Sequence, residues 1–135
     1  MRVRSAGLGL MLLLLLLSGL SGLAACGGSG GGGGSAGGGA PAGSLQVGMS
    51  EFKFTPSTLQ AKSGSVNFLL NNTGTTAHDM VIADASGKQV AKSELVQPGN
   101  QATFTVANVA AGTYTIFCDV PGHRAAGMEG TLTVT

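Results

Sequence analysis

The stretch Cys118-Asp-Val-Pro-Gly-His123-Arg-Ala-Ala-Gly-Met128 carries the residues that decide how this chain folds. Four residues separate the cysteine from the histidine, and four more separate the histidine from the methionine. The chain has two histidines in all, and the other one, His78, lies well upstream. Two histidines and a cysteine in a plane, with a weak axial methionine, describe a blue-copper site for electron transfer. These residues therefore predict a copper centre.

The residues between these donors explain how the donors meet. Val120 to His123 fit a type II turn, which takes proline at its second position and glycine at its third. We expect this turn to bring His123 back beside Cys118. Gly127 then lets the chain bend, so that Met128 closes the site before a final strand.

Residues 45–135 show the alternation of apolar and polar side chains that is typical of β-strands. The alternation is clear in four segments, at residues 66–71, 103–106, 113–118 and 131–134. His78 begins a further candidate strand over residues 78–82. Turns rich in glycine, asparagine and proline separate these segments, so the pattern favours a small antiparallel β-sandwich or barrel.

The composition limits the kinds of protein that this chain can be. A length of 135 residues allows one domain, which excludes a multidomain enzyme. The formal net charge is only +1, so no nucleic acid is expected as a partner. The chain has 24 glycines, and many of them lie in a spacer between an apolar leader and the strand-rich part.

The first part of the chain resembles the beginning of a bacterial lipoprotein. Residues 1–25 contain two early arginines, then a leucine run and then small residues, as secretory signal peptides do. Leu23-Ala-Ala-Cys26 resembles a lipobox, which implies cleavage before Cys26 and lipidation of its thiol. Plain secretion and an uncleaved membrane anchor remain as alternatives. Residues 26–44 then form a lipidated cysteine with a glycine-rich flexible tether, and residues 45–135 form the folded domain.

The folded domain resembles the cupredoxins, the family of plastocyanin and azurin, over nearly all of residues 45–135. The matching residues of the first half are Phe54-Thr55-Pro56, Leu59, Gly64, Val66, Phe68, Asn71 and His78. Those of the second half are Gly112-Thr113-Tyr114, Cys118, Pro121-Gly122-His123, Gly127-Met128, Gly130, Leu132 and Val134. The loop from the cysteine to the second histidine is more similar in length to that of auracyanins, rusticyanins and sulfocyanins than to that of plastocyanin.

The resemblance implies an all-β fold, a Greek-key β-sandwich of about eight strands with one type 1 copper at one end. The implied copper ligands are His78, Cys118, His123 and Met128, with His123 as a solvent-facing port for electrons. Family members often carry asparagine after the first histidine, and this chain has Asp79 there. An ionised carboxylate only accepts hydrogen bonds, so Asp79 needs a hydroxyl or N–H donor on the opposite loop.

We expect a monomeric, membrane-tethered protein that carries single electrons outside the cytoplasm between a redox protein donor and a redox protein acceptor. We do not expect an enzyme, because copper enzymes of this kind need a second copper centre and both histidines are already used. A copper-delivery or storage lipoprotein and a copper-free adhesion module are alternatives. Taken singly, Cys118 also fits an inert buried thiol, and Met128 a residue of the core.

Overall fold

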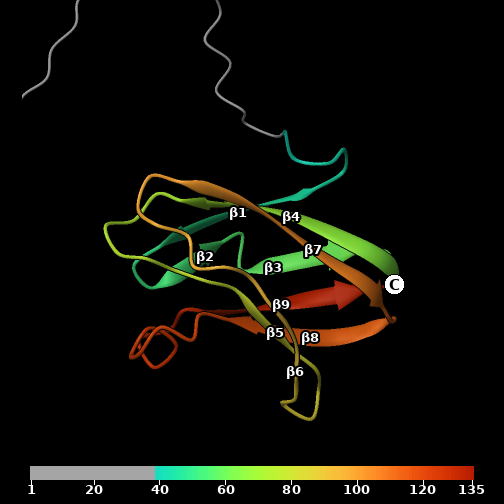
Figure 1. The fold of residues 1–135 in the computed structure, drawn as a ribbon. Coiled ribbons are helices and arrows are strands. Elements are labelled where there is room, and N and C mark those ends of the chain that lie inside the picture. Colours follow the sequence, from blue (N-terminus) through green and yellow to red (C-terminus); the bar gives the residue numbers. More distant parts are fainter. Residues whose placement is uncertain (1–38) are drawn as a thin grey trace, which may run out of the picture. The chain divides into compact units, whose positions relative to one another are not determined.

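The computed structural model describes residues 39–135. The predicted signal peptide, the predicted lipidation site Cys26 and most of the predicted tether lie outside the described residues. No helix of the described part is long and apolar enough to cross a membrane. Between residues 39 and 135 the chain forms nine strands (Figure 1), namely β1 (Leu45–Ser50), β2 (Lys53–Thr55), β3 (Thr58–Ala61), β4 (Gly64–Asn72), β5 (Val81–Ala83), β6 (Gln89–Lys92), β7 (Gln101–Val109), β8 (Gly112–Phe117) and β9 (Glu129–Val134).

The strands form two sheets that face each other, which confirms the expected all-β sandwich (Figure 1). One sheet has the order β2-β1-β4-β7, and the other has the order β3-β9-β8-β5-β6. β1 pairs with β4 in parallel, and β3 pairs with β9 in parallel. The sheets are therefore mixed: the other five strand pairings are antiparallel, as the sequence predicted, and these two parallel pairings were not predicted. Alternation of side chains reports which face of a strand is buried, and it carries no information on the direction of the neighbouring strand.

The alternating apolar side chains fill the space between the two sheets. Val66, Phe68 and Leu70 of β4 are buried, as their period-two spacing predicted. Phe68 stacks on Phe104 of β7 with ring centroids 5.6 Å apart. Burial of each such side chain contributes about 1.5–3 kcal/mol to the free energy of unfolding. The core thus fixes the strands whose ends carry the site.

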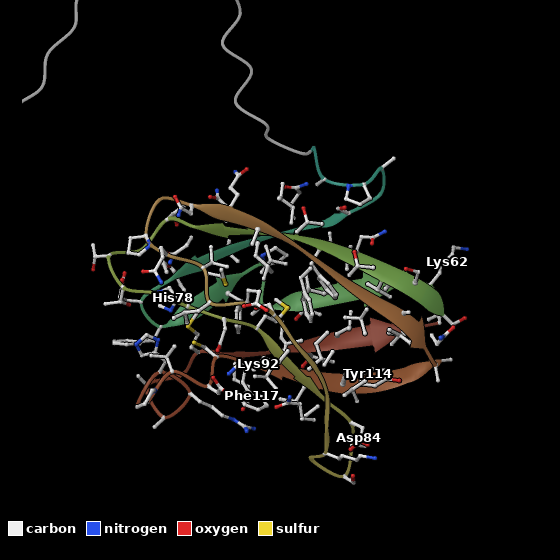
Figure 2. The ribbon with its side chains drawn as sticks, viewed as in Figure 1. Lys62, His78, Asp84, Lys92, Tyr114 and Phe117 are labelled. Carbon is white, nitrogen blue, oxygen red and sulfur yellow. The ribbon has the colours of Figure 1, made fainter. Side chains whose placement is uncertain are left out.

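The segments that carry the predicted metal donors gather at one end of the sandwich. His78 lies in the segment between β4 and β5, and residues 118–128 connect β8 to β9. Figure 2 shows His78 at this end and Lys62 and Tyr114 toward the other. At that far end, the hydroxyl of Tyr114 donates a hydrogen bond to the carbonyl of Ala110 at 2.9 Å.

Candidate metal centre

Three donor side chains from two loops meet at this end of the sandwich. His78 Nδ1 lies 3.1 Å from His123 Nδ1, and Cys118 Sγ lies 4.0 Å from the first nitrogen and 3.6 Å from the second. All three residues are buried. Metal–nitrogen and metal–sulfur bonds are about 2.0–2.3 Å long, so three donors at these separations can bind one ion. The structure therefore brings together the three strong donors that the sequence predicted.

The backbone of the 118–128 loop ties its three donor residues to one another. The His123 N–H donates to the carbonyl of Val120 at 3.0 Å, and Gly122 has a φ of 86°, which confirms the predicted type II turn. The Met128 N–H donates to the carbonyl of His123 at 3.0 Å, and the Cys118 N–H donates to that of Met128 at 3.1 Å. The side chain of Met128 is fully buried at this end.

The backbone of His78 is held by Val96 rather than by a strand of its own. The His78 N–H donates to the Val96 carbonyl at 3.1 Å, and the Val96 N–H donates back at 2.8 Å, in an isolated bridge. The predicted strand over residues 78–82 was wrong at its start, since β5 begins at Val81. The reason is that the N–H of Met80 donates to the hydroxyl of Ser93 at 3.0 Å and not to a backbone carbonyl of a neighbouring strand.

Asp79 joins the two donor loops. Its Oδ1 accepts a hydrogen bond of 2.9 Å from the N–H of Asp119, which is the kind of loop donor that the carboxylate was expected to need. Its Oδ2 lies 3.1 Å from Lys92 Nζ, which also donates to both carboxylate oxygens of Asp119. Both carboxylates raise the pKa of Lys92, and the contribution of Asp119 is larger than that of Asp79. This role of Lys92 could not be predicted from the sequence, in which the residue resembles any exposed lysine.

Glu51 lies beside His78, on the side of the ring that faces away from Cys118. Its Oε1 accepts hydrogen bonds from the N–H groups of Thr75 and Thr76 at 2.6 and 2.9 Å, and it lies 3.8 Å from His78 Nε2. Hydrogen bonds from its own N–H and from those of Thr75 and Thr76 lower the pKa of Glu51 to about 2. No motif marks Glu51 in the sequence, because this contact depends on a pairing of distant segments.

An aromatic side chain covers the second histidine. The ring of Phe52 meets the ring of His123 edge-on, with centroids 5.1 Å apart and planes at 72°. His123 is only 8% exposed, whereas Phe52 is 41% exposed. The solvent-facing histidine implied by the resemblance is therefore largely covered here. Phe52 is a third residue at the site, after Lys92 and Glu51, that the sequence did not single out.

Comparison with known proteins bears on this geometry. The family model described as a cupredoxin-like domain matches residues 12–134. The chain belongs to the cupredoxin-like family. A curated relative of this cupredoxin, auracyanin-B of Chloroflexus aurantiacus, is 44% identical over 46 residues, which are 34% of this chain and 20% of the relative. The chain thus matches about a fifth of the length of that curated protein.

Solved structures of related proteins share the fold of this cupredoxin. Reduced auracyanin from Roseiflexus castenholzii has a TM-score of 0.61 and 22% identity, over 68% of this chain and 96% of that chain. Auracyanin A from Chloroflexus aurantiacus has a TM-score of 0.61 and 22% identity, over 68% and 98%. Amicyanin from Paracoccus versutus has a TM-score of 0.53 and 21% identity, over 70% and 84%. At these identities the likeness confirms the β-sandwich alone.

The donor set of this cupredoxin fits one type 1 copper ion. Burial lowers the pKa of His78, with a further contribution from His123, and so favours the neutral imidazole that binds metals. Burial raises the pKa of the Cys118 thiol, and a bound metal ion offsets this effect because it takes the thiolate as its ligand. Within residues 39–135, these two histidines and this cysteine form the only cluster of such donors. Two imidazoles with a thiolate suit copper of the blue type.

Proposed function

We propose that this cupredoxin carries single electrons between redox proteins, and that it does so outside the cytoplasm on a lipid anchor at Cys26. One observation carries the electron-transfer proposal, namely the buried cluster of His78, Cys118 and His123 at the end of a β-sandwich. When bound, copper supplies a one-electron couple within reach of biological potentials. Auracyanin A, which shares the fold, is described as a blue copper protein, and this supports the proposal.

The protein's own residues would hold the ion and keep its surroundings constant. His78, Cys118 and His123 would be the three strong ligands, and Met128 the weak axial one. The Val96 bridge holds the first histidine, and the bond from Asp119 to Asp79 fixes the spacing of the two loops. A donor geometry held from several sides changes little when the charge at its centre changes, which suits rapid electron exchange.

The proposed position outside the cytoplasm, on a lipid anchor at Cys26, is supported by the sequence alone. The lipobox-like residues before Cys26 would direct cleavage and lipidation, and the following glycine-rich segment would let the domain move between partners. Several acyl chains on one cysteine hold a protein on a membrane durably. The partners would be proteins, and the chain would act as a monomer.

The visible spectrum tests the function directly. We expect the purified protein with one equivalent of Cu(II) to be intensely blue or green through charge transfer from the Cys118 sulfur. Cys118→Ser should remove the band and leave a folded sandwich, as judged by circular dichroism. Met80→Leu, which changes another buried sulfur, is the matched control and should keep the colour. A colourless copper-loaded wild type, or a serine variant that keeps the band, would refute the proposal.

A further inference from the structure

Glu51 connects the turn between β1 and β2 to the segment that leads into His78. Besides the two backbone N–H groups, its Oε1 accepts hydrogen bonds from the hydroxyls of Thr75 and Thr76 at 3.0 and 3.3 Å. Four donors thus converge on one carboxylate oxygen. Gly74 leaves room for this arrangement, because a Cβ at that position would lie 2.8 Å from the same oxygen.

The same carboxylate oxygen lies behind the ring of His78. His78 Nε2 is 3.4 Å from the hydroxyl oxygen of Thr76 and 3.8 Å from Glu51 Oε1, while Nδ1 faces Cys118 and His123. A proton on Nε2 is favoured beside an anionic oxygen, and a lone pair there is disfavoured. The ring is therefore held in the tautomer that leaves the lone pair of Nδ1 available to bind a metal, on the side that faces Cys118 and His123.

A second residue, the buried Asn72, also holds the segment that leads into His78. Asn72 Nδ2 donates to the carbonyls of Thr76 and Val96, both at 2.8 Å, and its Oδ1 accepts from the N–H of Gly74 at 2.9 Å. Loss of the Glu51 carboxylate therefore leaves the loop with its buried anchor. The fold should survive a change at Glu51, so the contribution of its side chain can be measured separately.

We infer that Glu51 is a positioning residue of the metal centre, which fixes the orientation of His78 and places a negative charge behind that ring. The inference rests on the proposed function for its effect on electron transfer. A negative charge near a ligand stabilises Cu(II) more than Cu(I), since the interaction grows with the charge of the ion. Glu51 thus lowers the reduction potential and tightens binding of divalent metals.

Two variants separate the effect of the Glu51 charge from the effect of its hydrogen bonds to Thr75 and Thr76. Glu51→Gln keeps the size and an acceptor oxygen and loses the charge, and Glu51→Ala loses both. Asp84→Asn is the matched control, because the Asp84 carboxylate also accepts N–H bonds, from Ser86 at 2.9 Å and from Lys88 at 3.0 Å. Figure 2 shows Asp84 in the turn between β5 and β6, well apart from His78.

Redox titration and cobalt binding are the measurements. We expect Glu51→Gln to have a higher reduction potential than the wild type and to stay folded, with a somewhat lower melting temperature without metal, because the folded protein favours the ionised carboxylate. Asp84→Asn should keep the wild-type potential. We expect Glu51→Ala to bind Co(II) about 10–100-fold more weakly, as loss of groups that orient metal ligands does. Equal potentials in Glu51→Gln and the wild type would overturn the inference. A copper-loaded wild type without the blue band would instead overturn the proposed function, and cobalt affinity would still decide the role of Glu51.

Discussion

At the scale of single residues, Met128 is held by the backbone of the same loop that carries Cys118 and His123. Its side chain is fully buried, and its backbone bonds to both His123 and Cys118. These backbone bonds thus place Met128 at the end of the sandwich where the histidines and the cysteine meet. A buried methionine in such a place fits either a weak ligand or a packing residue, and the two roles respond differently to substitution.

Met128→Leu distinguishes these two roles. Leucine has nearly the same volume, so the substitution should cost less than about 1.5 kcal/mol of stability. If the thioether is an axial ligand, its loss should raise the reduction potential, because a hydrocarbon cannot stabilise Cu(II). The potential is measured by redox titration, with Met80→Leu as the control for a buried methionine. An unchanged potential would assign Met128 to the core.

The sequence predicted the donor residues that lie on one loop better than the residues that support them. Cys118, His123 and Met128 follow from one turn and one bend, which are local chemistry. The importance of Glu51 and Lys92 depends on which distant segments the fold places side by side. The Glu51–Thr75 and Lys92–Asp119 contacts join residues 24 and 27 positions apart, and no local pattern encodes them.

At the scale of strands, the hairpin of β5 and β6 places the ammonium group of Lys92 beside the donor loops. Lys92 pairs with Val81 in the register of this hairpin, and its side chain reaches Asp79 and Asp119. Asp79 is almost fully buried, and a buried carboxylate without a nearby cation destabilises the fold. A short strand at the edge of the sheet therefore stabilises the connection between the two loops.

Lys92→Met should lower the melting temperature of the protein without metal. The reason is that the buried Asp79 carboxylate keeps the Asp119 N–H and loses its cation. Calorimetry measures the effect, and Lys88→Met on the same hairpin is the control, because Lys88 forms no ion pair among residues 39–135. Adding Asp79→Asn should recover part of the loss, since a neutral amide needs no cation. Equal melting temperatures for the two lysine variants would contradict this role.

The strands themselves were predictable to different degrees. The nine-residue β4 alternates over its whole length, so the sequence identified its buried face correctly. β2 and β3 have three and four residues, which is too short for a period to be recognised. The parallel pairing of β1 with β4 is set by the path of the chain between the sheets, which burial patterns do not report.

At the scale of the whole molecule, attachment to a membrane depends on one cysteine in the leader. If Cys26 is lipidated, the wild type should sediment with membranes, and its mature N-terminus should be the modified cysteine. Cys26→Ala should leave the precursor uncleaved, which mass spectrometry detects, while the copper site still forms. Asp84→Asn should be processed like the wild type. A wild type found in the medium with an unmodified N-terminus would exclude the lipid anchor.

The depth of the site in the fold also bears on whether the protein carries electrons or delivers copper. Delivery requires the ion to leave, and departure is easiest from open, methionine-rich sites. Here His78 and Cys118 have no exposed surface, and Phe52 covers the ring of His123. His78 is also bonded to Val96, and Lys92 of β6 forms an ion pair with Asp119 at the start of the other donor loop. A metal ion held in this way leaves only when a loop opens, which favours retention.

Repeated oxidation and reduction in the presence of a strong copper chelator tests retention. We expect the wild type to keep nearly all of its copper, measured by metal analysis after gel filtration, because the buried donors serve both oxidation states. His123→Gly is the comparison, since it opens the covered side of the site while leaving His78 and Cys118 in place, and it should lose copper faster. If the wild type loses most of its copper within a few cycles, reduction releases the ion, and copper delivery is the function of this protein instead.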